Sequence, residues 1–529
     1  MKGVLVIMCS QVVIKLFGFI YRVILTNIEG FQDVGNSYYG SGYKVYTFIL
    51  AIATTGIPNT ISKLVSEKIA IGDKRGAHNV FKTALKVFGI VGVLFALLLF
   101  LGSNFIANSI LANPGVKGTI ATLAPAVFFV AIAAVFRGYF VGMQNMSAHS
   151  KAQVIEQIVN SIFSVVFVMM LVGNSPEIMA MGSTAATAVS TLTALLYLVF
   201  YYNKNKTEIW KEISKSKRFP KDTTGEIVRK IFRYAIPLSF ASVVVALAGM
   251  VDLVTVVEGL QKFGYTLEIA NEKFGIILGK VDILVSIPHA FNVALVIPLI
   301  PAITAHIARK EKKEAINKIN NCMKISTLIA FPCAAGLTIL AQPIFETVFP
   351  NASSGALLLQ IEVWAVIFSL LAQTAYGALH GIGKMYVPGV TVLIAAIVKY
   401  ILNIILIPIY GEIVVPITTI VYHMVACIIS MTVLYKTIRT VPDFKNIIIK
   451  PFIATLGMGI IVILIRKFMV YISAGTVMSM GVSVVAGIAT YAILLIITGV
   501  LGKEELSAIP YGNKICNALE NKKKKQKKC

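Results

Sequence analysis

The chain has 529 residues, of which 57% are hydrophobic and only 14% charged, and its mean hydropathy is +0.82. Soluble globular proteins carry about 25% charged residues, so this composition excludes a soluble enzyme, a disordered chain and a fibrous repeat. Lys and Arg number 48 against 24 Asp and Glu, which gives a net charge of +24. In a soluble protein this excess would suggest nucleic-acid binding, whereas in a membrane protein it marks loops that stay in the cytoplasm.

Fourteen apolar runs are long enough to cross a membrane, because a spanning helix needs about 20 apolar residues. The first six lie at 3–27, 43–64, 84–108, 119–143, 153–172 and 178–202. After a basic stretch, eight more lie at 231–256, 275–304, 322–345, 356–380, 387–407, 413–435, 446–465 and 476–501. The sequence therefore predicts an all-α integral membrane protein of about fourteen transmembrane helices.

Lys and Arg gather in alternate loops, which predicts how the spans are oriented. The segments after spans 2, 6 and 8 hold clusters of bases, whereas the loops after spans 1, 5 and 9 are acidic or free of bases. Both termini are therefore predicted to be cytoplasmic, which fits an even number of spans. The excess charge then reports topology and contact with anionic lipid headgroups, so membrane lipids, and no nucleic acid, are the expected partners.

A basic stretch after the sixth span divides the chain. The predicted segments are a first six-helix lobe, a cytoplasmic linker, a second six-helix lobe, two further helices and a basic tail, at 1–202, 203–229, 230–440, 441–502 and 503–529. The two lobes share a Gly-x3-Gly-x3-Met motif, at 138–146 in span 4 and at 377–385 in span 10. This repeat indicates an internal duplication, with the ordinary use of small residues at helix contacts as the alternative.

Spans 2 and 8 carry Gly and Pro inside their apolar runs: Gly56 and Pro58 in the first, Pro288 and Pro301 in the second. Proline removes a backbone donor and clashes with the preceding turn, so it bends a helix. Internally duplicated transporters bind substrate between their repeats, beside helices interrupted in this way. These four residues are candidate gating bends, and a static kink is the alternative.

Two basic residues lie deep in the first span. Ionisable groups in a span are costly, so they face a cavity or a partner. Lys15 and Arg22 are seven residues apart, which places them on one helix face about two turns apart. Two cations with no acid in the same span suit a polyanionic ligand such as a diphosphate. For Arg22, near the outer interface, snorkelling to that interface is the alternative.

Further charged residues in the spans have less specific interpretations. Asp252, Lys280 and Asp282 are candidates for contact with a coupling ion or the substrate, or pair with one another at the interface. Arg137 and Glu156, both toward the cytoplasmic side, are predicted to form a structural ion pair. The sequence shows no catalytic constellation, no Gly-rich phosphate loop and no metal-ligand spacing, so we expect a transporter without cofactor or metal.

Several segments resemble the MurJ-type lipid II flippases and the stage V sporulation protein B group: Ile14 to Arg22, Gly56 to Glu67, Leu123 to Met146, and Gln153 to Gln157. That group belongs to the multidrug/oligosaccharidyl-lipid/polysaccharide exporter superfamily. The resemblance implies two pseudo-symmetric six-helix lobes in a V around a central cavity. It also implies that helices 13 and 14 line a groove for a polyprenyl tail.

The function that the resemblance implies is a flippase of the bacterial cytoplasmic membrane. It would move an undecaprenyl-diphosphate-linked cell-wall precursor, lipid II or a similar molecule, from the inner to the outer leaflet by alternating access. In MurJ-type members basic residues on helix 1 line the cavity, and Lys15 and Arg22 match those positions. A base expected early in helix 8 has no match, because Ile283 stands there, which fits the sporulation-type branch better than the Gram-negative branch.

Three other functions stay open at the level of sequence. One is a flippase for another lipid-linked saccharide, such as a capsule or teichoic-acid precursor. Another is a cation-coupled multidrug exporter, although a basic first helix and two extra spans argue against it. The third is a scaffold that does not transport but assembles proteins of cell-wall or spore-cortex synthesis. The same proteins are possible partners if the chain is a flippase.

Overall fold

The computed structural model describes residues 2–51, 56–216, 219–220, 222–441 and 443–500, and the side chains of most of them. Within these ranges the regular structure is entirely helical. The expectation of an all-α membrane protein is confirmed. The tail at 503–529 lies outside the described residues, as do Lys217, Arg218 and Lys221 of the linker.

The first half of the chain forms one lobe. Its helices are α1 (Lys2–Thr26), α2 (Gln32–Ala51), α3 (Ile57–Ala70), α4 (Lys74–Phe105), α5 (Val116–Gly142), α6 (Met146–Met170) and α7 (Pro176–Ser214). Helix α5 occupies the middle of the lobe, where it packs against α2, α3, α4 and α7. Its sequence is apolar on all sides, as expected for a helix surrounded by other helices.

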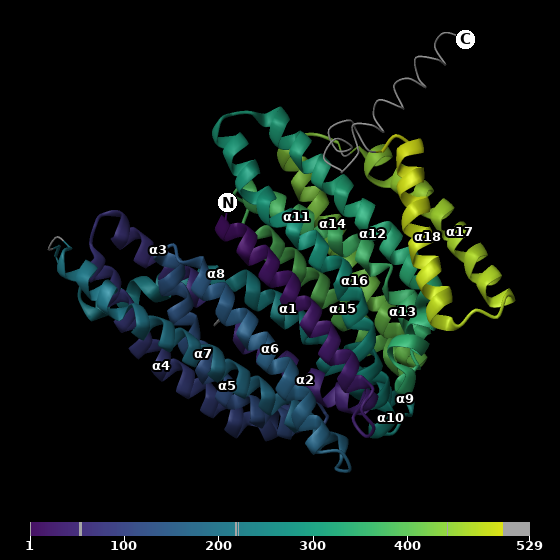
Figure 1. Ribbon diagram of the computed structural model, residues 1–529, viewed down its shortest axis with the longest axis horizontal. Coiled ribbons are helices and arrows are strands. Elements are labelled where there is room, and N and C mark those ends of the chain that lie inside the picture. The colour runs from purple at the N-terminus through teal and green to yellow at the C-terminus, as the bar shows by residue number, and fades with distance from the viewer. Residues whose placement is uncertain (1, 52–55, 217–218, 221, 442, 501–529) are drawn as a thin grey trace, which may run out of the picture.

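The second half forms the other lobe and two additional helices. The lobe consists of α8 (Thr224–Gly249), α9 (Val251–Phe263), α10 (Leu267–Ile276), α11 (Asp282–Ala308), α12 (Lys312–Val348), α13 (Ala356–Glu362), α14 (Ala365–Gly381), α15 (Val387–Tyr410) and α16 (Val414–Ile438). A π-helical turn, Ile277–Val281, joins α10 to α11. Helices α17 (Lys450–Tyr471) and α18 (Thr476–Ile497) pack on each other and on α12, outside the lobe (Figure 1).

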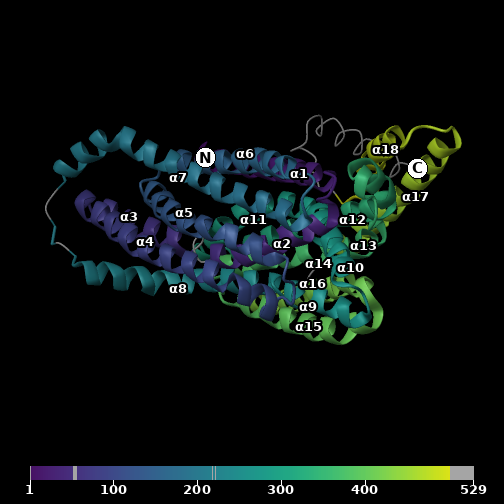
Figure 2. The ribbon, with the colours of Figure 1, turned by 90° about the horizontal axis from the view of Figure 1, so that it is seen from below.

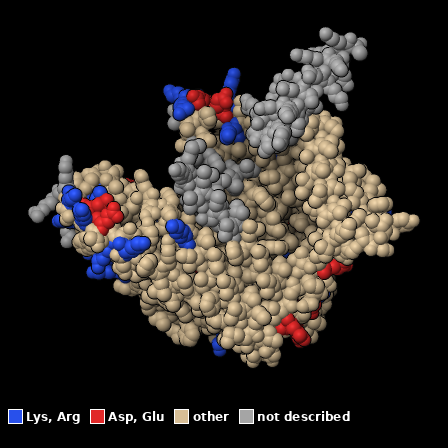
Figure 3. Space-filling view, in the orientation of Figure 1, with Lys and Arg blue, Asp and Glu red and all other residues tan. Residues whose placement is uncertain are grey.

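The two lobes diverge from a shared base and give the molecule the outline of a V (Figure 1). At the base, α2 of the first lobe packs against α10 and the π-helical turn of the second. Helix α8 also joins the lobes, because it contacts α2, α3 and α4 as well as α15 (Figure 2). In the space-filling view the outline is notched between the arms, and most of the visible Lys and Arg side chains lie at the free ends of the arms (Figure 3).

Ten helical segments of the described chain are long and apolar enough to cross a membrane, or up to eleven if the bent pair of α13 and α14 is counted as one span. One of the ten, Val387–Ile438, contains both α15 and α16 and therefore two expected spans. The exact count of fourteen stays a prediction.

Span 2 begins earlier than the hydropathy indicates. The sequence predicts it at 43–64, but α2 starts at Gln32 and ends at Ala51, and α3 starts at Ile57. The first turns of α2 are rich in Gly, Ser and Tyr and are buried against α5 and α10. Gly42 permits this contact, because an added Cβ would lie 2.5 Å from Thr119 Oγ1 of α5. Close packing, which hydropathy does not register, makes this segment helical.

The linker predicted at 203–229 is shorter in the structure. Helix α7 continues through Ser214, since residues 203–214 contain neither Gly nor Pro and are rich in Lys and Glu, which favour helix. Helix α8 begins with a capping box, in which Thr223 and Glu226 each bond the other's backbone N–H.

Candidate functional site

Helix α1 lies at the edge of the first lobe that faces the second lobe (Figure 1). It packs along α6 and also contacts α2 and α11. The side chain of Lys15 is exposed on this helix. Its charge acts on His289 of α11 in the second lobe. Lys15 is therefore exposed on a helix that contacts both lobes.

Arg22, two turns further along α1, lies against α2. Its guanidinium carbon is 4.1 Å from the centre of the Tyr39 ring, and its Nη1 donates to Asn36 Oδ1 at 3.5 Å. The Tyr21 and Tyr39 hydroxyls are 3.1 Å apart and hold the ring in place. A cation over an aromatic face keeps its positive charge. The structure thus orients Arg22 by contacts that include no carboxylate among the described residues.

Several other bases in the helices lie against carboxylates. The pairs are Lys44 with Asp282 at 3.4 Å, Lys280 with Asp33 at 2.8 Å, Lys399 with Asp252 at 2.6 Å, and Arg137 with Glu156 in close contact. Lys15 and Arg22 differ from them, because neither forms an ion pair with a residue that the structure describes. An uncompensated cation at membrane depth is costly and suits an anionic ligand.

Lys280 is fully buried at the joint between the lobes. Its ammonium contacts the Asp33 carboxylate and donates to the carbonyl oxygens of Ala352 and Ser354 at 2.7 and 2.8 Å. These acceptors satisfy its three N–H groups. The geometry gives Lys280 a part in holding α2 to the second lobe. Sequence reasoning missed Asp33, because the loop in which it was expected to lie is the first turn of α2.

Asp252 and Asp282 belong to a second charged group, which five helices build. Asp252 of α9 accepts from Lys399 and, at 3.1 Å, from Asn403, both on α15. Asp282 of α11 pairs with Lys44 of α2, and so links the lobes. The sequence places Lys44 at the edge of a predicted span, and only the early start of α2 brings it onto a helix beside Asp282.

Glu362 at the end of α13 completes this group. It is 2% exposed, and its Oε2 has no hydrogen-bond partner among the described residues. The charges of Asp252, Asp282, Lys44 and Lys399 all act on it. The group therefore holds three carboxyl groups and two amino groups. The sequence signal for Glu362 is an acid inside an apolar run, which by itself does not show what surrounds it.

The candidate bends in span 2 lie at the start of α3. Pro58 is the second residue of that helix, where proline is tolerated. At Gly56 an added Cβ would lie 1.7 Å from Ser239 Oγ and 3.0 Å from the carbonyl oxygen of Ala235, both on α8. Gly56 thus permits close contact between the lobes.

The candidate bends in span 8 lie within α11. Pro288 is buried in this helix, directly before His289, and the helix stays continuous on both sides of it. The side chain of Pro301 lies outside the described residues. The irregular part of this span is the π-helical turn before α11.

Replacing Gly56 by Ala is expected to destabilise the protein by about 1–3 kcal/mol, because α3 and α8 would have to move apart. Gly89 on α4 is the matched control, since an added Cβ there meets nothing within 4 Å. Gly89→Ala should be neutral or stabilising by about 0.5–1 kcal/mol. Thermal unfolding of both variants in detergent compares them. Equal melting temperatures would show that the Gly56 contact does not matter.

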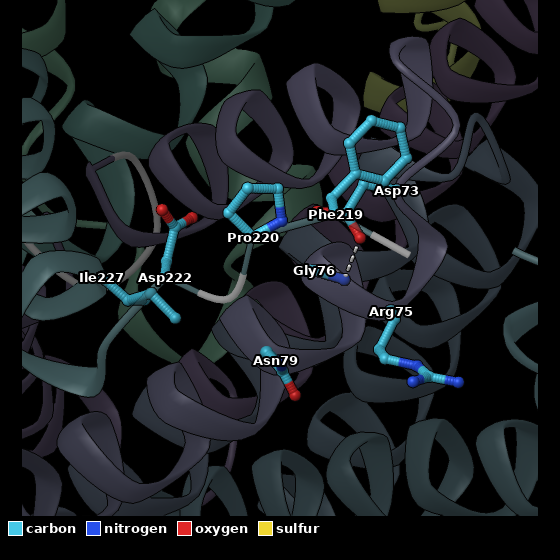
Figure 4. A pocket seen from close by; sticks show the side chains of 8 residues that line it. All are labelled: Asp73, Arg75, Gly76, Asn79, Phe219, Pro220, Asp222 and Ile227. Atoms are coloured by element: carbon cyan, nitrogen blue, oxygen red, sulfur yellow. Dashed lines mark hydrogen bonds between the residues drawn. The ribbon is translucent and has the colours of Figure 1, made fainter. Parts of the chain in front are cut away.

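A separate pocket of about 330 Å³ lies at the free end of the first lobe (Figure 4). Asp73, which lines it, caps α4 by accepting from the Gly76 N–H at 2.7 Å. Asp222, also in its wall, pairs with Lys68 at 2.8 Å and Lys230 at 3.2 Å. These lysines hold the pKa of the Asp222 carboxyl below its usual value. The contacts fasten the linker to the turn between α3 and α4.

Comparison with known proteins places the chain in a family. The family model described as polysaccharide biosynthesis protein matches residues 1–304, and the one described as lipid II flippase MurJ matches residues 280–497. Lipid II flippase MurJ of Bacillus subtilis (strain 168) is 26% identical over 421 residues, 76% of this chain and 76% of that protein. Stage V sporulation protein B of the same organism is 26% identical over 373 residues, 70% of each chain.

Solved structures share the fold. The structure described as "Lipid II flippase MurJ, inward closed conformation" has a TM-score of 0.65 at 15% identity, and the match covers 93% of this chain and 98% of that one. An inward-facing multidrug resistance MATE transporter of the MOP superfamily also has a TM-score of 0.65, at 16% identity over 82% of this chain and 98% of that one. The chain therefore belongs to the polysaccharide biosynthesis protein family and is a relative of the MurJ and stage V sporulation protein B group.

Proposed function

We propose that the protein is a flippase for an undecaprenyl-diphosphate-linked cell-wall precursor, lipid II or a similar molecule. The observation that carries the proposal is the difference between two sets of bases. Lys15 and Arg22 have no carboxylate partner among the described residues, whereas Lys44, Arg137, Lys280 and Lys399 each have one. The family supports it, since its relatives include a protein named as a lipid II flippase. The direction we propose is from the inner to the outer leaflet.

The headgroup would enter between the arms of the V, from the side that the basic loops predict to be cytoplasmic. Its diphosphate would meet Lys15 first and Arg22 two turns deeper. Lys acts as a point charge, and the planar fork of Arg matches phosphate oxygens. The polyprenyl tail would stay in the bilayer beside α17 and α18, many of whose apolar side chains are exposed.

Alternating access requires the base of the V to open. The half-exposed pair of Lys44 and Asp282 crosses the boundary between the lobes there. Exposed pairs contribute about 0–1 kcal/mol, so this contact can break and re-form. We propose that this pair helps to close the outer side of the protein and separates when that side opens. Asp252 and Asp282, beside Glu362, stay candidates for contact with a coupling ion.

Besides a coupling ion, the membrane potential is a source of energy that we propose for the alternating-access cycle. Each charge that crosses the field gains about 2.3 kcal/mol per 100 mV. A cavity that carries the unpaired charges of Lys15 and Arg22 would be driven toward the negative inner side when it is empty.

The test is a flipping assay in vesicles that contain the purified protein. Fluorescent lipid II and an undecaprenyl diphosphate with a single sugar are compared, with protein-free vesicles as the control. Movement of lipid II supports the proposal. Movement of the single-sugar lipid alone would show that the protein transports another lipid-linked saccharide. Export of a cationic dye without movement of either lipid would favour the multidrug exporter and overturn it.

A further inference from the structure

An apolar groove lies between α2, α3, α4 and α5 of the first lobe and α8 of the second. Its volume is about 390 Å³, and the side chains lining it are apolar except for Ser239. One wall follows α4 from Phe88 to Phe95, and the other follows α8 from Phe232 to Val243. Ile236 and Phe240 on α8 are 67% and 45% exposed, so the groove is open to the outside at its middle.

The groove has the length of one acyl chain. From Phe232 to Val243, α8 rises by about 16 Å at about 1.5 Å per residue. This is close to half of the hydrocarbon thickness of a bilayer, which is about 30 Å. An undecaprenyl chain is far longer than this groove, whereas a phospholipid chain in one leaflet matches it.

Basic side chains gather at one end of the groove. On α8, Arg229 lies one turn before Phe232 and on the same helix face as Ile236. Arg229 and Arg233 are both exposed, and neither forms an ion pair with a described residue. On α3, Lys63 Nζ lies 3.7 Å from the centre of the Tyr234 ring. This end of α8 follows the basic linker, at the level predicted for the headgroups of the cytoplasmic leaflet.

We infer that this groove binds one acyl chain of an anionic phospholipid, whose phosphate lies at Arg229 and Arg233. Arginine matches phosphate geometry, and bases near an anionic leaflet are attracted to it. Because α8 belongs to the second lobe and the other walls to the first, the lipid contacts both lobes. The site is distinct from the surface of α17 and α18 that we propose for the tail of the transported lipid.

A photoactivatable phosphatidylglycerol analogue in vesicles that contain the full chain tests the inference. Labelling is expected in the segments 88–95 and 232–243. Ile236→Trp fills the groove from an exposed position and should abolish this labelling. Val245→Trp is the control, because Val245 is also on α8, is 55% exposed and does not line the groove.

The headgroup is tested separately. Replacing both Arg229 and Arg233 by Gln should lower labelling by about thirtyfold, since each base near an anionic surface contributes about 1 kcal/mol. A phosphatidylcholine analogue should label even the unchanged protein only weakly. Labelling spread evenly over the outer apolar surface, or an equal loss in both Trp variants, would show ordinary boundary lipid and overturn the inference. Displacement by undecaprenyl phosphate but not by phosphatidylglycerol would also overturn it. None of these measurements depends on flipping.

Discussion

Lys15→Ala and Arg22→Ala are each expected to lower the flipping rate of lipid II by about tenfold or more, with little effect on folding. A hydrogen bond to a charged group contributes about 1.5–3 kcal/mol, which corresponds to about ten- to a hundredfold. Neither residue forms an ion pair with a described residue, so their removal leaves no buried carboxylate without a partner. The rate is measured in reconstituted vesicles, with expression and melting temperature followed in parallel.

Two controls separate charge at the site from charge in general. Lys117→Ala removes an exposed base elsewhere on the first lobe and should leave the rate unchanged. Lys15→Arg keeps the charge and should retain most of the activity. If Lys15→Ala and Arg22→Ala flip lipid II at the rate of the unchanged protein, these residues do not hold the diphosphate.

Lys280→Ala should be strongly destabilising, by about 3–5 kcal/mol. It removes the cation from a buried pair and leaves the Asp33 carboxylate, 8% exposed, without it. The free energy of unfolding in a mild detergent is the measurement. The apolar double variant Asp33→Leu with Lys280→Met should recover much of the loss, because burying two matched apolar groups avoids the cost of burying charges.

The pair of Lys44 and Asp282 provides a matched comparison at the same boundary. Its side chains are 28% and 39% exposed, so Lys44→Met should cost no more than about 1 kcal/mol. If Lys280→Ala costs equally little but lowers lipid binding, Lys280 contacts the substrate and the structural role given to it here is wrong.

The sequence predicts most of the architecture, because long apolar runs and bases in alternate loops are direct signals of membrane spans and their orientation. Apolar length shows that a segment spans the membrane. Helix interruptions and buried polar segments are harder to predict from sequence, since their structure depends on the residues that pack against them. The start of α2 is the clearest example. Residues 32–42 are too polar for hydropathy to mark, yet α5 and α10 bury them as helix.

The sequence likewise predicts one part of the candidate site and not the other. Spacing along one helix places Lys15 and Arg22 on one face, since the periodicity of a helix is a local property. The acid that neutralises a given base on another helix cannot be found from the sequence around that base. Lys280 meets Asp33 from a distant part of the chain, and Lys44 meets Asp282. The sequence likewise suggests a bend at Gly56, and only the position of Ser239 shows that Gly56 permits close contact with α8.

The sequence by itself therefore predicted the membrane location, the helical class, the division into two lobes and the position of Lys15 and Arg22 on one face of the first helix. The tertiary structure decided which charges are compensated, and it placed Glu362 in a group of five ionisable residues. The reason is that hydropathy and helical spacing act over a few turns of one helix. The cost of a buried charge depends on neighbours from other helices, which only the folded arrangement brings near.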